Sequence, residues 1–179
     1  MVNKIMKTNL IFLLLTLTGL TNVSSCKKEN LNVLPPETQS GKNTFGCLID
    51  GELFEGGCCA PWMHPIISAG YYIVSDKLNI VVWGKMSGNP VGNIGMAIDH
   101  PIQNSIQSTA EISYQPLSMQ CQEYLPAGNA EVFITKLYTI NKIVSGRFQF
   151  VGYCNNGDST NMREITQGRF DLKLDVVNE

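Results

Sequence analysis

The sequence has few histidines and lacks the common catalytic motifs. It has only two histidines, His64 and His100, and each of them stands before a proline. No CxxC or HExxH pair is present, so the common zinc-ligand spacings are absent. The sequence also has no GxSxG motif, which removes the usual nucleophile elbow of hydrolases. We therefore expect no bound metal and no cofactor, and catalysis is not our first interpretation.

Positive charge is scarce as well. The chain has 13 basic and 15 acidic side chains, and no stretch of it gathers Lys and Arg into a patch. Proteins that bind nucleic acid neutralise phosphates with such patches. The charge pattern therefore argues against a nucleic-acid partner.

The sequence lacks an apolar run of the roughly 20 residues that a membrane-spanning helix needs. The apolar core at Leu10 to Leu20 follows Lys4 and Lys7, and it has the form of a secretory signal peptide. The residues VSSC at 23–26 then resemble a bacterial lipobox. This resemblance implies cleavage before Cys26, with lipid on its sulfur and on its new amino group. The partner implied is a membrane, reached through that lipid.

Three regions follow from this interpretation. The predicted signal peptide spans residues 1–25 and holds two of the basic side chains and none of the acidic ones, which leaves a mature charge of −4. Residues 26–43 are polar and proline-containing, as expected of a lipidated N-terminus with a flexible tether. Residues 44–179 form one domain of ordinary size. We expect an exported lipoprotein of the bacterial cell envelope, attached to the outer membrane, on either its periplasmic or its surface side.

Six cysteines are present, and export would place them in an oxidising compartment where disulfides persist. With Cys26 lipidated, five remain, so one or two bridges form and at least one thiol is left over. We expect bridges that join the loop at 55–65 to the loops holding Cys121 and Cys154. The disulfide candidates are Cys47, Cys58, Cys59, Cys121 and Cys154.

Beyond the signal peptide, no segment shows the apolar stripe of a helix. Alternating apolar residues instead predict β-strands near residues 44–54, 67–74, 78–83, 94–99, 109–114, 130–140, 143–153 and 169–176. Glycine and proline interrupt these segments throughout. The pattern is typical of an all-β fold, either an antiparallel sandwich or a partly open barrel of about eight to ten strands.

Three short segments give sharper predictions. Asp50-Gly51 stands between two apolar runs and favours a type I′ hairpin turn. The last strand alternates strictly, which places Phe170 and its apolar companions on the core and Asp171 with its charged companions in water. Gly-Arg-Phe occurs at 146–148 and again at 168–170. A pair of ligand contacts would explain why this tripeptide occurs twice. We favour the interpretation that two neighbouring strands pack against the core in the same way.

The two ends of the mature chain carry a family resemblance. LPPETQSGKNTFGCLIDGELF at 34–54 and ITQGRFDLKL at 165–174 are similar to segments of a family of small uncharacterised lipoproteins from Bacteroidetes-type bacteria. The resemblance implies an exported, anchored β domain and brings no activity with it. The Cys58-Cys59 doublet and the loop at 62–64 depart from the family pattern.

Aromatic side chains are the best candidates for ligand contacts, because rigid rings offer a large contact area. Trp62 and His64 lie in the cysteine-rich loop, and Tyr71 and Tyr72 lie in the strand predicted after it. Trp83 ends an apolar strand and is expected in the core.

The sequence thus predicts a lipid-anchored envelope protein whose β domain binds or scaffolds without catalysis. The ligand and any protein partner stay open. One alternative is a carrier for small molecules or lipids, which requires an apolar cavity inside a barrel. Another is an envelope hydrolase, which would use His64 or His100 in a cleft of titratable groups.

Overall fold

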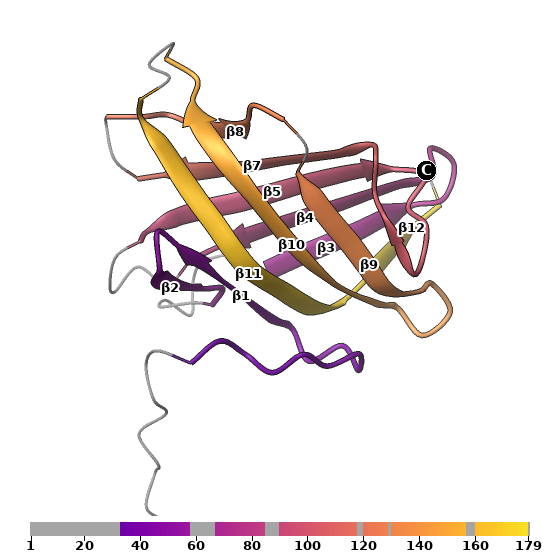
Figure 1. Ribbon diagram of the computed structural model, residues 1–179. Helices are drawn as coiled ribbons and strands as arrows, with labels where there is room; N and C mark the ends of the chain where they lie inside the picture. Colours follow the sequence, from indigo (N-terminus) through magenta and orange to yellow (C-terminus); the bar gives the residue numbers. More distant parts are fainter. Residues whose placement is uncertain are drawn as a thin grey trace, which may run out of the picture. The chain divides into compact units, whose positions relative to one another are not determined.

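The computed structural model describes residues 33–57, 67–84, 90–117, 120–128, 130–156 and 160–178. Over these ranges the fold is all-β, with 12 strands in a single curled sheet that forms a half-barrel (Figure 1). The prediction of an all-β sandwich or partly open barrel is confirmed. Within the same ranges, no helix is long and apolar enough to cross a membrane.

The first half of the sheet is antiparallel. In spatial order it contains β3 (Ile67–Tyr72), β4 (Lys77–Trp83), β5 (Gly92–Asp99), β7 (Ala110–Pro116) and β8 (Tyr124–Pro126). Side chains alternate along each strand, so that Leu78, Ile80 and Val82 of β4 are fully buried while their neighbours face outward. One face of this half therefore forms the core.

The second half continues the same sheet. It contains β10 (Ile143–Cys154), β11 (Met162–Lys173), β1 (Thr44–Ile49) and β2 (Glu52–Glu55). Strand β9 (Glu131–Tyr138) also pairs with β10, and the short β6 (Ser105–Ile106) pairs with β9. Asp50 and Gly51 join β1 to β2 with φ angles of 51° and 83°. A type I′ turn needs two positive φ angles, so the predicted hairpin is confirmed.

The end of the chain brings the two halves together. The single strand expected at 169–176 is wrong, because β11 ends at Lys173 and Leu174 leads into a separate strand, β12 (Asp175–Val177). Strand β12 pairs in parallel with β3, the one parallel pairing among the described strands. A bridge between Gly56 and Gly84 also links the end of β2 to the end of β4. The sheet therefore curls until its halves face each other.

Aromatic rings fill the space between the two halves. Phe45 stacks on Phe148 with ring centroids 5.2 Å apart, and Phe54 contacts both Phe45 and Tyr114 edge-on. Tyr114 in turn stacks on Tyr124 at 5.9 Å. Because these rings are almost fully buried, they occupy the volume in which a carrier would hold its cargo.

The two Gly-Arg-Phe segments lie side by side on β10 and β11. Gly146 pairs with Phe170, and Gly168 pairs with Phe148, so each glycine leaves room for the ring of the other strand. A Cβ atom on Gly146 would lie 2.5 Å from Phe170, and one on Gly168 would lie 2.6 Å from Phe148. This supports the interpretation that the two Gly-Arg-Phe segments are alike because their strands pack in the same way.

The cysteines pair differently from our prediction. Cys121 and Cys154 form a disulfide with each other, with Cα atoms 5.7 Å apart, so neither bridges to the loop at 55–65. The pairing of β8 with β10 brings them together, because Cys154 lies opposite Tyr124. Cys47 is a fully buried free thiol whose pKa is raised by burial, so its proposed role in a disulfide is wrong. Cys58 and Cys59 lie outside the described residues.

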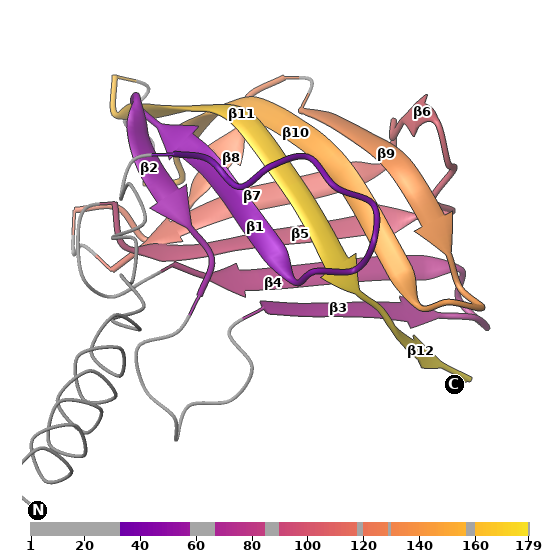
Figure 2. The same cartoon turned by 90° about the horizontal axis from the view of Figure 1, so that it is seen from below.

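Residues 33–43, which we call the strap, cross the outer face of β1, β11 and β10 (Figure 2). The expected flexible tether is therefore wrong over this stretch, and residues 26–32 lie outside the described residues. Pro35 covers Gly46, where a Cβ atom would lie only 2.6 Å from the proline ring. The strap is fixed chiefly by the carboxylate of Asp171, which is 1% exposed.

Five donors converge on that carboxylate. The hydroxyls of Thr38 and Ser145 donate to it at 2.5 and 2.8 Å. The backbone N–H groups of Ser40, Gly41 and Lys42 donate at 3.1, 2.8 and 3.3 Å. Burial alone would raise the pKa of Asp171, but these hydrogen bonds outweigh it and lower the pKa to about 2. The prediction that Asp171 faces water is wrong, because the strap covers it.

Candidate functional site

The candidate residues predicted from the sequence do not gather into one site. Tyr71 and Tyr72 are neighbours on β3 and point to opposite faces of the sheet. Tyr71 packs against the core, while Tyr72 lines a shallow groove on the outer face. Trp62, His64 and the lipidation candidate Cys26 lie outside the described residues.

Trp83 was expected in the core and is exposed instead. Its side chain is 44% exposed, because Val82 takes the inward position at the end of β4. The apolar run at the end of β4 is continuous in the sequence, but its residues alternate between the two faces of the sheet.

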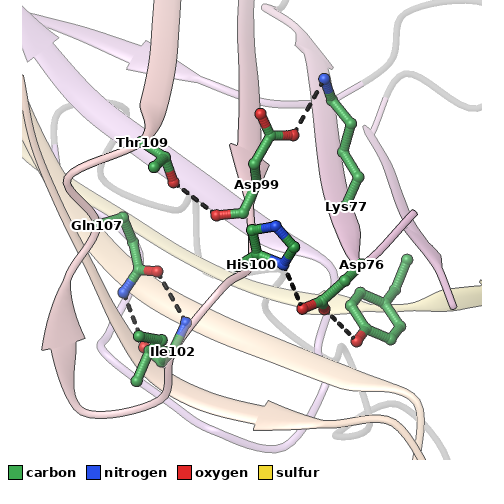
Figure 3. Close-up of polar contacts among 8 residues, drawn as sticks. Asp76, Lys77, Asp99, His100, Ile102, Gln107 and Thr109 are labelled. Atoms are coloured by element: carbon green, nitrogen blue, oxygen red, sulfur yellow. Dashed lines mark hydrogen bonds and ion pairs between the residues drawn. The ribbon is translucent and has the colours of Figure 1, made fainter. Parts of the chain in front are cut away.

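His100 belongs to a polar cluster at the end of β5 (Figure 3). Its Nδ1 lies 2.8 Å from Asp76 Oδ2, and the Tyr71 hydroxyl donates to Asp76 Oδ1 at 2.6 Å. Hydrogen bonds from Tyr71 and His100 lower the pKa of Asp76. The His–Asp pair is the kind that orients a general base.

Other side chains of this cluster form hydrogen bonds with the backbone of the loops. A catalytic His–Asp pair would need a nucleophile, and a hydroxyl such as that of Thr109 is one type. This hydroxyl instead donates a hydrogen bond to the backbone carbonyl of Asp99 (Figure 3). Gln107 bonds both the N–H and the carbonyl of Ile102. The His100 side chain is 75% exposed, so water competes for its interactions. We interpret the cluster as a set of hydrogen bonds that stabilises the turns between the strands.

A better candidate lies at the opposite end of β5, in a cavity of about 480 Å³. We call it the mouth pocket. Three segments far apart in the sequence build it: the β1–β2 hairpin, the ends of β5 and β7, and the start of β11. It is lined by Ile49, Asp50, Glu52, Pro90, Val91, Tyr114, Pro116, Leu117 and Arg163.

Arg163 is the central charge of the mouth pocket. Its Nη1 lies 2.8 Å from Asp50 Oδ2, and its guanidinium carbon lies 5.6 Å from the centre of the Tyr124 ring. Asp50 is itself held, because its Oδ1 accepts the backbone N–H of Glu164 at 2.9 Å. Burial lowers the pKa of Arg163, but the hydrogen bond to Asp50 and the nearby Tyr124 more than offset this and raise it. The guanidinium is therefore charged and fixed in place.

Tyr114 forms the inner wall of the mouth pocket. It is 3% exposed, and its hydroxyl donates to the carbonyl of Val91 at 3.1 Å. Burial raises its pKa to about 12, so the phenol stays neutral at physiological pH. The pocket thus combines one cation, two carboxylates and a neutral, apolar rim that includes the exposed Leu117.

Sequence reasoning missed this site. Asp50 was recognised only as a turn residue, and Arg163 lies in a part of β11 that was not predicted as a strand. The usable signal was the charged residue at the tip of the predicted hairpin, since loop tips often carry binding groups. Its partner could not be identified without the pairing of β1 with β11, which places Ile49 opposite Ile165.

Metal ligation has no support in the described ranges, where no three His, Cys, Asp or Glu side chains lie close enough to hold an ion. Comparison with protein-family models, with curated proteins and with solved structures gave no significant match. The resemblance to the lipoprotein family stays a prediction. The residues that carry it do, however, meet in this fold, because the LPP and TQSGK segments form the strap and the GRFD segment supplies Asp171.

Proposed function

We propose that this protein is a lipid-anchored envelope protein whose barrel binds a small polar ligand in the mouth pocket, without catalysis. The observation that carries the proposal is the fixed Asp50–Arg163 pair in the wall of a cavity of about 480 Å³. Pockets of this size with a few oriented polar groups and an apolar rim are typical of small-molecule sites.

The chemistry of the pocket restricts the ligand. A guanidinium has five N–H donors, and the bond to Asp50 leaves others available to a ligand carboxylate or hydroxyl. Glu52 and the second lone pairs of Asp50 accept hydrogen bonds from hydroxyl or ammonium groups. The apolar rim of Pro90, Pro116 and Leu117 would contact carbon atoms. A free amino acid or a monosaccharide offers this combination of groups.

The packed interior favours this function over a carrier. The rings of Phe45, Phe54, Phe148 and Tyr124 fill the space between the two halves of the sheet, whereas a carrier needs that space for its cargo. A surface pocket needs only a rigid support, and the aromatic core beneath Tyr114 provides it. A hydrolase built on His100 is less well supported, because that residue lies on an exposed turn at the other end of β5.

The strap determines how close to the membrane the barrel would sit. Leu34 lies over Gly46 of the sheet and is eight residues after Cys26. Eight extended residues reach at most about 29 Å. A lipid on Cys26 would therefore hold the barrel near the membrane surface, rather than at the end of an 18-residue tether.

Thermal unfolding in the presence of free amino acids and monosaccharides tests the binding function. We expect at least one of the two classes to raise Tm in a concentration-dependent way, since a ligand that binds only the native state stabilises it. Arg163→Ala should abolish this rise, while Lys77→Ala, which removes a cation from the opposite end of the barrel, should keep it. A rise that survives in Arg163→Ala, or no rise with either class, would disprove the mouth pocket as the site.

Intact-mass spectrometry of the protein purified from its membrane tests the anchor. We expect a mature chain that begins at Cys26 and carries acyl chains, and reduction should add the mass expected for opening the Cys121–Cys154 bridge. Metabolic fatty-acid labelling should disappear in Cys26→Ala. Labelling that persists in this variant would rule out Cys26 as the lipidated residue.

A further inference from the structure

The geometry points to a second site, a phosphate-binding site between Arg147 and Arg169 on the outer face of the barrel. The two arginines come from the two Gly-Arg-Phe segments and lie directly opposite each other on β10 and β11. They line a cavity of about 120 Å³, which we call the arginine pocket. It is separate from the mouth pocket and shares no residue with it.

Placing two cations opposite each other across an antiparallel pair is unfavourable unless something compensates the charge. Within the described residues, no ion pair reaches either guanidinium. Arg147 lies over the ring of Phe133, with its guanidinium carbon 5.6 Å from the ring centre. Arg169 donates to the carbonyl of Pro35 at 3.3 Å, which holds it beneath the strap. Both side chains are thus oriented, and neither forms an ion pair with a described carboxylate.

The strap and the strands form the walls of the arginine pocket. Residues 36–39 of the strap close one side, and Gly146 of β10 lies in the lining. Thr44 and Thr135 add hydroxyl groups from β1 and β9. Thr135 faces outward because Ile134 before it is buried, and it lies where the pairing of β9 with β10 shifts register between Ser145 and Gly146. Glu37 lies on the exposed strap side and is the one carboxylate in the lining.

These groups suit a tetrahedral oxyanion better than other ligands. Guanidinium groups bind phosphate oxygens in a bidentate fashion, and hydroxyl groups complete the donor set. The arginine pocket, at about 120 Å³, is much smaller than the mouth pocket of about 480 Å³, which favours a compact ligand such as a phosphate group over a sugar. The phosphate could be free in solution or belong to a phospholipid headgroup, and the experiment separates these sources.

The site depends on the strap, and this connects it to Asp171. Thr38 donates to Asp171 and also lines the arginine pocket. When Asp171 no longer holds the strap, the pocket loses the wall formed by residues 36–39. Phosphate affinity should therefore fall when the strap is released, although Asp171 itself does not line the pocket.

Isothermal titration calorimetry of the full chain in neutral detergent tests the site, with inorganic phosphate as the probe at constant ionic strength. We expect Arg147→Gln and Arg169→Gln each to raise the dissociation constant at least about tenfold, as expected for the loss of a charge-assisted pair. Lys173→Gln removes an equal charge from an exposed position on β11 and should change it less than about twofold. Arg147→Lys keeps the charge without the planar fork, and it should give an intermediate affinity with an unchanged unfolding midpoint.

A second arm adds phosphatidylglycerol to the detergent in place of inorganic phosphate. Binding of both probes with the same dependence on the two arginines indicates a general phosphate site. Binding of the lipid alone, with that dependence, indicates a headgroup site. Absence of binding in both arms, or binding that persists in Arg147→Gln and Arg169→Gln, would overturn the proposal. The mouth pocket is unaffected by either result, because its test depends on Arg163.

Discussion

The barrel has two outer faces whose strands share the same alternating pattern of residues. The outward residues of the two faces differ in how far they are exposed to solvent. On the face of β3, β4, β5 and β7, which we call the open face, outward residues such as Val81 and Trp83 are each 44% exposed. On the strap face, formed by β1, β10 and β11, the outward residues Ser145 and Asp171 are 1% exposed. The strap turns part of a solvent-facing surface into a buried polar cluster around Asp171.

The chemistry of each face matches its environment. The open face has a groove of about 550 Å³ over small residues such as Gly95, Ala97 and Ser113, and its charges form exposed pairs such as Lys77–Asp99. The strap face buries a single carboxylate, and five donors satisfy it. A buried charge is tolerated only when its hydrogen bonds replace those of water. The strap is therefore a structural part of the domain.

The largest difference between the faces is expected in the free energy of unfolding, when one carboxylate charge is removed from each face. Asp171→Asn replaces an acceptor oxygen by an NH₂ group that faces backbone and hydroxyl donors. We expect the free energy of unfolding to fall by about 2–3 kcal/mol. Asp99→Asn breaks an exposed ion pair and should cost less than about 1 kcal/mol. Urea unfolding of both variants measures the two values.

Proteolysis reports which part of the molecule responds. In Asp171→Asn, cleavage within residues 33–43 should become faster, whereas Asp99→Asn should leave it unchanged. Equal protection of the strap in both variants would show that apolar contacts, such as Pro35 on Gly46, suffice to hold it.

Acid should weaken the strap face selectively. The pKa of Asp171 is about 2 in the folded protein, below the ordinary value of 3.8, so the unfolded chain takes up the proton more readily. Its contribution is fully present above about pH 4, and it is lost as the pH falls toward 2. At about 1.4 kcal/mol per pKa unit, the loss amounts to at most about 2.5 kcal/mol.

The pH experiment compares the wild type with Asp171→Asn. The stability difference between them should be constant near neutral pH and should shrink as the pH falls from about 4 to 2. A difference that stays constant down to pH 2 would mean that folding does not shift the pKa of Asp171.

These contrasts also explain which parts of the fold the sequence could predict. The open face follows local rules, so the strands at 78–83 and 94–99 were predicted from alternation alone, although Trp83 was placed on the wrong face. The strap face depends on contacts between residues about 130 positions apart, such as Gly41 and Asp171. Local patterns cannot report such contacts, so a proline-containing polar segment was predicted to be a free tether.

The site residues follow the same division. Asp50 stood out because Asp-Gly fixes a local turn, while Arg163 became its partner only through the pairing of β1 with β11. Arg147 and Arg169 were noticed as parts of a repeated tripeptide, and their adjacency needed the register of β10 against β11. The disulfide is a third case, because β8 was too short to be predicted and it is β8 that brings Cys121 near Cys154.

A smaller difference in the free energy of unfolding is expected between alanine substitutions at two outward-facing glycines, one on each face. A methyl group on Gly46 would lie 2.6 Å from Pro35, so Gly46→Ala must displace the strap. On Gly95 the nearest atom is the Ser113 hydroxyl at 3.8 Å, an ordinary contact. We expect Gly46→Ala to cost about 1–2 kcal/mol, and Gly95→Ala to be neutral or slightly stabilising.

Unfolding midpoints in urea measure this pair, and hydrogen exchange at Gly41 and Lys42 shows whether the strap has moved. Faster exchange in Gly46→Ala alone is the expected result. If both variants are neutral, the strap adapts to the extra methyl group, and its position is held by Asp171 rather than by close packing on β1.

The smallest effect should come from Trp83 on the open face. A tryptophan is usually costly to remove, but this one is 44% exposed and Val82 beside it fills the core position. We expect Trp83→Thr to change the free energy of unfolding by less than about 0.5 kcal/mol, because threonine suits an exposed strand. In a Trp62→Phe background, the fluorescence of Trp83 should be that of a solvated indole and should be quenched readily by iodide. A loss of several kcal/mol, or a shielded emission spectrum, would show that part of the molecule covers the open face as the strap covers the other.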